Sequence, residues 1–131
     1  MKETAIRENH LYNKTYTRGK RSVGKYVAVY VLKDLAAKRL KKANPQGEYI
    51  NRLGVSVSKK IGGAVQRNRA KRIIRAAYRV HADRLSRGNL IVISARAAIL
   101  GKKSGDIEVE LLKAFKELGL MAEIPPETEE K

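Results

Sequence analysis

The sequence lacks cysteine entirely, has only two histidines, and carries few acidic residues for its length of 131. Without cysteine the chain can form no disulfide and supports no thiolate chemistry, and nothing in it points to an oxidising compartment. The longest apolar run, Tyr26 to Leu32, is too short to span a bilayer, and the N-terminus lacks the apolar core of a secretory signal. We therefore expect a cytoplasmic protein with no membrane partner.

The shortage of acid leaves the chain strongly basic, with 29 Lys and Arg against 13 Asp and Glu and a formal net charge of +16. Such an excess repels itself and attracts nucleic acid or, as the weaker choice here, an anionic membrane. The length suits one domain with a modest core. We expect a single α/β domain over residues 1–121 and a disordered acidic tail over residues 122–131, rich in proline and glutamate.

Basic residues are concentrated in the segment Val55 to Arg79, which contains no Asp or Glu. The segment begins as an alternating strand, turns at Gly62 and Gly63, and continues as a helix that should end near Gly88. A solvated helix usually mixes Glu with its Lys and Arg and gains pairs between residues four apart. Because this helix has no such pairs, we interpret its charged side as a surface for phosphate groups. The alternative is a cationic face that is merely solvated.

The predicted helix has two different faces. At about 100° per residue, a narrow polar stripe lies opposite an apolar side, so the helix can pack on a core and still present a surface to a polyanion. The predicted stripe consists of Asn68, Arg72, Arg75 and Arg79, flanked by Arg67 and Lys71, and the predicted core side consists of Ala70, Ile73, Ile74, Ala77 and Val80.

Strands and further helices are predicted around this basic helix, and a βαβ unit should run from the strand before it to the strand after it. The side chains of the first predicted strand alternate between two apolar faces, one containing Tyr30 and Leu32 and the other Val29 and Val31. Both faces should therefore be covered. The predicted elements are a short helix within Thr4–Arg18, a strand at Lys25–Leu32, a helical or irregular excursion at Lys33–Gln46 with a turn at Asn44–Gly47, a strand or two short strand segments with a break near Asn51 at Glu48–Ser58, a buried strand at Leu90–Ala95, and a last helix capped by Asp106 and ended by Gly119.

Two local patterns have both a structural and a functional interpretation. Tyr12 and Tyr16 share a helical face, where the rings can stack on unpaired bases or simply pack on a sheet. Gly54 and Ser56 share a strand face that leaves the backbone open to a ligand or merely faces solvent. A cationic face with nearby tyrosines favours nucleic-acid binding, and a helix backed by a sheet favours structured RNA over DNA.

Residues suited to protein-side catalysis are few. No Walker loop, zinc pattern or nucleophile elbow is present. His81 falls on the apolar side of the basic helix, where a core histidine is more common than a general base. Asp106 and Glu110 share a helical face and are conceivable metal ligands, although the dipole of the first helical turn explains acids there. We expect no catalytic residue and no metal site on the protein.

The run from Ser56 to Arg72, SVSKKIGGAVQRNRAKR, closely resembles the signature of the bacterial ribonuclease P protein family. Its centre is the triplet Arg67-Asn68-Arg69, and the resemblance extends over roughly Glu8 to Leu118. It implies an α+β fold, a two-layer α/β sandwich with a central mixed β-sheet, similar to the second domain of a small-subunit ribosomal protein. It also implies a left-handed βαβ crossover, against the usual right-handed rule.

The same resemblance implies a function. In this family the RNA subunit is the catalyst, and Mg²⁺ bound mainly by that RNA activates the water that removes the 5′ leader of precursor transfer RNA. The protein would be part of an enzyme only as a subunit of that endoribonuclease, binding ribonuclease P RNA and precursor tRNA but no DNA. The alternative is a structural ribosomal or other structured-RNA-binding protein without a processing role.

Site residues follow by position from the resemblance. Those implied to face the catalytic RNA are Lys59, Lys60, Arg67, Asn68, Arg69, Lys71, Arg72, Arg75 and Arg79, and those implied to bind the 5′ leader are Tyr12, Tyr16, Tyr30, Arg52 and Ser56. The chain also departs from the family pattern. Ala76 stands where glutamate is frequent, so any role of that acid is absent here. Tyrosine replaces the frequent phenylalanine at positions 12 and 16, and the connection Lys33 to Gly47 is longer than is common.

Overall fold

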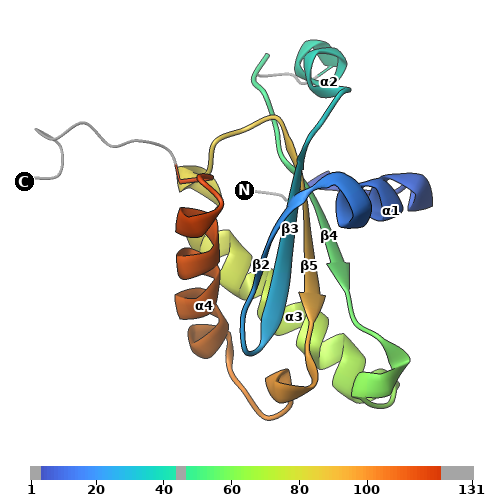
Figure 1. The fold of residues 1–131 in the computed structure, drawn as a ribbon, viewed down its shortest axis with the longest axis vertical. Helices are drawn as coiled ribbons and strands as arrows, with labels where there is room; N and C mark the ends of the chain where they lie inside the picture. The colour runs from blue at the N-terminus through green and yellow to red at the C-terminus, as the bar shows by residue number, and fades with distance from the viewer. Residues whose placement is uncertain (1–3, 44–46, 122–131) are drawn as a thin grey trace, which may run out of the picture.

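A five-stranded mixed sheet lies between one helix on one face and two helices on the other (Figure 1). The computed structural model describes residues 4–43 and 47–121. In chain order the elements are β1 (Thr4–Ala5), α1 (Asn9–Arg18), β2 (Lys20–Val23), β3 (Val27–Lys33), α2 (Ala37–Ala43), β4 (Arg52–Ser56), α3 (Ala64–His81), β5 (Asn89–Ala95) and α4 (Ser104–Glu117), with short 3-10 helices at Lys59–Ile61, Ala82–Arg84 and Ala97–Ile99.

The strands are ordered β1-β4-β5-β3-β2, with β1, β4 and β5 parallel to one another and β3 antiparallel to both of its neighbours. In Figure 1, β4 and β5 both run downward, β4 lies to the right of β5, and α3 passes behind them. This arrangement is a left-handed βαβ connection, the rare hand for such a unit. The predicted fold class and its unusual crossover are therefore confirmed.

Alternation along the strands produces two separate apolar layers. Val29 and Val31 of β3 belong to the main core, together with Ile74 of α3 and Phe115 of α4, both fully buried. A smaller layer on the opposite face is built on Leu90, Val92 and Ile6 and is covered by α1, with Leu11, Tyr12, Tyr16, Tyr30 and Leu32 packed against it. The two faces predicted for the strand at residues 25–32 are confirmed within β3. Tyr26, which precedes β3 and was predicted on the face of Tyr30 and Leu32, packs against the main core instead.

The predicted core side of α3 is correct except at its last residue. Ala70, Ile74 and Ala77 are buried, and Ile73 is half-buried. Val80 is 55% exposed, so its assignment to the core was wrong. The helix instead turns the neighbouring His81 inward, because that residue lies about 100° further round and packs on α4. The His81 Nε2 atom lies 2.9 Å from the Glu108 carbonyl oxygen, as expected for a core histidine.

Several element boundaries differ from the prediction. The short β2 was missed because three of its four residues, Lys20, Arg21 and Ser22, are polar and give no apolar alternation. The segment after β3, predicted as helical or irregular, contains a helix, α2. The last helix begins at Ser104 rather than Asp106, whose carboxylate still accepts the Lys103 N–H at 2.9 Å. Most of the predicted turn at residues 44–47 and the whole predicted tail, 122–131, lie outside the described residues.

Candidate nucleic-acid interface

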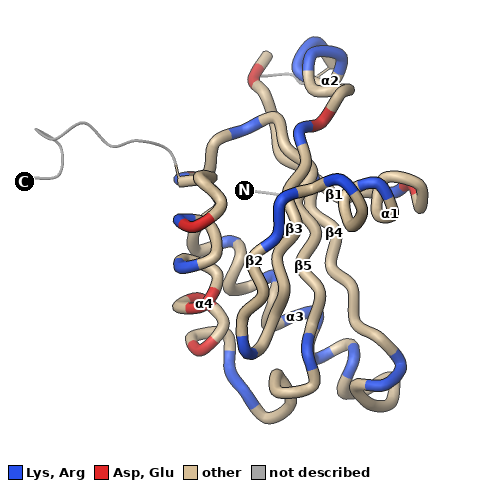
Figure 2. Tube along the Cα trace, in the orientation of Figure 1, with Lys and Arg blue, Asp and Glu red and all other residues tan. Residues whose placement is uncertain are grey.

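The outer face of α3 is a cationic stripe that points away from the protein. Asn68, Arg72, Arg75 and Arg79 are all exposed on the side opposite the buried Ile74. Within residues 4–43 and 47–121, no carboxylate lies within ion-pairing distance of Arg72 or Arg75. Figure 2 shows basic residues along α3 and the turn before it, while acidic residues gather on α4. The stripe predicted from sequence thus forms a continuous positive surface.

The other basic residues of this segment occupy three different environments. Lys59 and Lys60 are exposed in the 3-10 turn before α3, where the Ser58 hydroxyl accepts the Lys60 N–H at 3.2 Å. Arg69 donates from Nη2 to the Lys102 carbonyl oxygen at 3.0 Å, so part of its guanidinium serves the fold.

Arg67 and Lys71 are half-buried beside the stripe. The Arg67 Nε atom is a buried donor that has no hydrogen-bond partner among the described residues. Because a buried donor without an acceptor is unfavourable, Arg67 is well suited to donate a hydrogen bond to an incoming phosphate oxygen.

A second site lies on the opposite face of the sheet, where tyrosines of α1 meet the strands. The Tyr16 ring packs edge-to-face on Tyr30 with centroids 4.8 Å apart, and its hydroxyl lies 2.9 Å from the Ser94 hydroxyl oxygen. The residue opposite Ser94 in β4 is Ser56, which is half-exposed. The rings of Tyr16 and Tyr30 remain only partly buried. The structure therefore brings together the predicted Tyr16, Tyr30 and Ser56, and adds Ser94.

Tyr12 fills the face of β4 that glycine leaves open. A Cβ atom on Gly54 would lie only 2.6 Å from the Tyr12 ring, so this close approach requires glycine at position 54. The pKa of Tyr12 is raised, mainly by desolvation and also by Tyr16, while the positive charge of Arg75 and a hydrogen bond with the Val55 backbone act in the opposite direction. Tyr12 therefore stays a neutral phenol.

The cationic stripe and the tyrosine site lie on opposite faces of the sheet, and both α3 and Tyr12 contact β4. Part of the β4 edge between these faces is open, because β1 pairs with only its first two residues, Arg52 and Leu53. The remaining edge of β4, up to Ser56, has no strand beside it among the described residues.

Arg52 has a different environment from the open leader contact that was expected. Its side chain is buried, with Nε 2.8 Å and Nη2 3.0 Å from the two carboxylate oxygens of Asp34, and Nη1 3.2 Å from a Glu8 oxygen. The pKa of Arg52 is raised, chiefly by hydrogen bonding to Asp34. Desolvation, the next largest influence, acts in the opposite direction. The guanidinium is thus held by two carboxylates and joins α1, β4 and the loop before α2, so we correct its role to a structural one.

The acids that resembled metal ligands are used by the fold. Glu110 accepts three backbone N–H groups, from Lys25, Tyr26 and Val27, at 2.7 to 2.8 Å. Asp106 accepts the N–H at the start of α4. No cluster of metal-ligating side chains is found in the part of the chain that the structure describes. Nor does any helix there have the length and apolar character needed to cross a membrane.

Comparison with known proteins agrees with this geometry. The family profile described as Ribonuclease P matches residues 1–119. The chain belongs to the ribonuclease P protein family. The ribonuclease P protein component of Clostridium acetobutylicum is 38% identical over 121 residues, covering 92% of this chain and 93% of that protein. The Clostridium botulinum component is 40% identical over 121 residues, covering 92% and 98%.

Solved ribonuclease P proteins also share the fold. The Staphylococcus aureus RNase P protein superposes with a TM-score of 0.72 at 27% identity, covering 92% of this chain and 99% of that one. Ribonuclease P is a ribonucleoprotein that processes transfer RNA, and the matches favour this family over the structural ribosomal alternative.

The site contains partners that sequence reasoning missed. Ser94 carries no motif of its own beyond its place in an apolar strand, and only the sheet register brings it to Tyr16. Basic residues near α1 and α2, including Lys14 and Arg39, also line a cleft that no sequence motif indicated. The one available signal was the run of Lys and Arg in residues 38–42.

Proposed function

We propose that this chain is the protein subunit of a ribonuclease P holoenzyme that removes the 5′ leader of precursor transfer RNA. The outer face of α3 binds the RNA subunit, and the tyrosine site on the opposite face of the sheet holds the single-stranded leader. The observation that carries the proposal is the stripe on α3, where Arg72 and Arg75 are exposed without carboxylate partners in the described residues. The phosphates of an RNA backbone would supply the negative charges that pair with these arginines.

The protein contributes binding rather than bond-breaking chemistry in this proposal. Mg²⁺ ions held mainly by the RNA subunit would supply the activation of the attacking water, and no residue of this chain is assigned to that chemistry. Neutralising phosphates lowers the repulsion between two polyanions, ribozyme and precursor, which raises affinity for the substrate. The hydroxyls and partly exposed rings of Tyr12 and Tyr16 offer hydrogen bonds and stacking surfaces to unpaired bases. Acting on precursor tRNA, the chain would work in the cytoplasm, where bacteria make tRNA.

Reconstitution tests this proposal directly. Purified protein alone should cleave nothing, whereas adding it to ribonuclease P RNA at moderate Mg²⁺ should raise turnover and tighten binding of a precursor with a 5′ leader. The gain should be larger for the precursor than for mature tRNA, because only the precursor reaches the tyrosine site. Failure to stimulate the RNA would refute the proposal, and stable stoichiometric association with a ribosomal subunit would point to the structural alternative.

A further inference from the structure

A second cationic site lies between α1 and α2. A cleft of about 410 Å³ opens there, with Lys14 of α1, Lys33 at the end of β3 and Arg39 of α2 among its walls. The apolar residues Leu11 and Leu90 at its base belong to the layer beneath α1, so the cleft opens on the same face of the sheet as the tyrosines. The face covered by α3 lies on the other side.

The charges in this cleft are unbalanced. Its two acids, Glu8 and Asp34, both bind the buried guanidinium of Arg52. Lys33 and Arg39 are exposed, and neither side chain forms a hydrogen bond or ion pair with any described residue. With Lys14, the cleft therefore holds four cations against two carboxylates, and three of the cations have no internal partner. Such a site attracts a phosphate group.

An apolar side chain next to these cations adds a second recognition element. Leu35, in the loop before α2, lines the cleft and is 82% exposed. An apolar surface beside convergent cations fits an unpaired nucleotide, whose base needs an apolar contact and whose phosphate needs a positive charge. A base-paired strand would offer its phosphates but keep its bases stacked in the helix. The cleft is thus better suited to single-stranded RNA.

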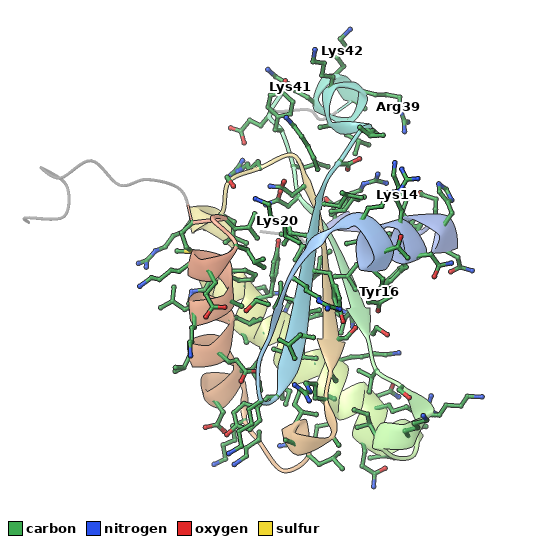
Figure 3. All side chains as sticks on the ribbon, viewed as in Figure 1. Lys14, Tyr16, Lys20, Arg39, Lys41 and Lys42 are labelled. Carbon is green, nitrogen blue, oxygen red and sulfur yellow. The ribbon has the colours of Figure 1, made fainter. Side chains whose placement is uncertain are left out.

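The cleft and the tyrosine site lie on opposite flanks of α1. Lys14 and Tyr16 are two residues apart, which turns their side chains about 200° from each other on a helix. Figure 3 shows Lys14 on the side of α1 facing Arg39, and Tyr16 on the other side. The outer surface between them carries the exposed Asn13 and Thr17, across which a polyanion can pass. A helix is about 10 Å wide, so the crossing takes about three or four nucleotides at duplex spacing.

We propose that the cleft between α1 and α2 binds one unpaired nucleotide of the 5′ leader, upstream of the nucleotides at the tyrosine site. Lys33 and Arg39 contact its phosphate, and Leu35 contacts its base. This inference rests on the proposed function, because the strand it engages is the leader. It assigns a role to the long connection after β3, and it makes binding depend on leader length. Only a leader long enough to cross α1 gains from the cleft.

Binding of precursors with different leaders to the reconstituted holoenzyme tests the inference. Precursors with leaders of about five and about fifteen nucleotides, and mature tRNA, are compared for the unaltered protein and for the double variant Lys33→Ala/Arg39→Ala. The unaltered protein should bind the long leader more tightly than the short one. The variant should lose this gain, binding the long leader about fivefold to tenfold more weakly while binding the short leader normally. Its salt slope with the long leader should fall by about 0.7, the value for one phosphate contact of a single strand.

A matched double variant controls for charge. Lys113→Ala/Lys116→Ala removes the same charge from exposed positions of α4, on the other side of the sheet, and should leave the effect of leader length intact. Equal losses for short and long leaders, weaker binding to the RNA subunit alone, or no loss at all would each overturn the inference.

A Tyr16→Ala variant separates this inference from the function on which it rests. Should the unaltered holoenzyme show no preference for leader-bearing precursor over mature tRNA, both proposals fail. Should Tyr16→Ala reduce that preference while the cleft variant keeps the gain from the longer leader, only the cleft assignment fails.

Discussion

Two helices on the same face of the sheet, α3 and α4, use their charges in opposite ways. The acids of α4 serve the protein itself: Glu110 binds three backbone N–H groups and Glu117 accepts the Ser22 hydroxyl at 2.7 Å. The arginines at positions 72 and 75 of α3 have no carboxylate partner among the described residues. Charges with internal partners stabilise a fold, whereas charges without them are available to another molecule. This difference predicts separate effects on stability and on binding.

The largest effect should come from the most buried charged group. Replacing Arg52 by alanine leaves Asp34 buried without its partner and should lower the free energy of unfolding by about 3–5 kcal/mol. Urea denaturation measures this loss. Variant protein that remains folded should keep the preference for leader-bearing precursor. Unchanged stability together with a lost leader preference would restore Arg52 as a leader ligand.

A smaller loss of stability should follow from Glu110→Gln in α4. The neutral amide accepts at one oxygen only and cannot satisfy the three N–H groups of residues 25–27, so we expect a destabilisation of about 2–3 kcal/mol. Thermal denaturation checks it, with Glu108→Gln on the same helix as the control. Affinity of the folded variant for the RNA subunit should not change. A selective loss of that affinity would contradict the division between the two helices.

Tyr16 should affect both stability and binding, because it has internal partners and a partly exposed ring. Tyr16→Ala should weaken binding of precursor by about 1–3 kcal/mol more than binding of mature tRNA, if the ring stacks on the leader. Equilibrium binding of both RNAs by the holoenzyme gives the difference. Tyr16→Phe keeps the ring and loses only the contact with Ser94, so it should retain most of the preference. Equal losses for both RNAs would show that the ring is only structural.

The smallest change in stability is expected on α3. Arg72→Ala and Arg75→Ala should each leave the free energy of unfolding within about 0.5 kcal/mol of the original value, since neither side chain is buried. Each substitution should weaken binding to the RNA subunit. It should also reduce by about one the slope of the logarithm of the binding constant against the logarithm of the salt concentration. Titrations of the RNA subunit at several salt concentrations measure both quantities. A substantial loss of stability with an unchanged salt slope would mean that the stripe serves the fold.

Sequence periodicity predicted the features that depend on local geometry. The two faces of β3 and of α3 followed from spacing alone, since burial repeats with the period of the element. Val80 was misplaced because the spacing does not show where the packed arc ends, which the position of α4 decides. The β2 strand was missed because an exposed edge strand needs no apolar alternation. Fold-level topology, including the left-handed crossover, came from the family resemblance and not from the residue pattern.

From the residue pattern alone, the candidate site was predictable only where it depends on one element, whereas the grouping of Tyr16, Tyr30 and Ser56 came from the family resemblance. The α3 stripe lies within 12 consecutive residues, 68–79, and was identified from them. Arg52 was misjudged because its partners, Asp34 and Glu8, are 18 and 44 residues away, and only the tertiary fold brings them together. Ser94 and the cleft beside Arg39 depend in the same way on strand register and on the position of α2.

The short first strand has a consequence for the proposed holoenzyme, in which two RNAs share one small protein. Adding two residues to its pairing with β4 would place a further row of backbone, about 4.8 Å wide, beside Gly54 and Val55. In the proposed arrangement, that row would cover the open edge of β4, which lies between the face for the RNA subunit and the face for the leader. The length of the N-terminal strand would then limit how closely the two RNAs approach each other around this edge, and extending it is a way to separate them without altering a residue assigned to either RNA.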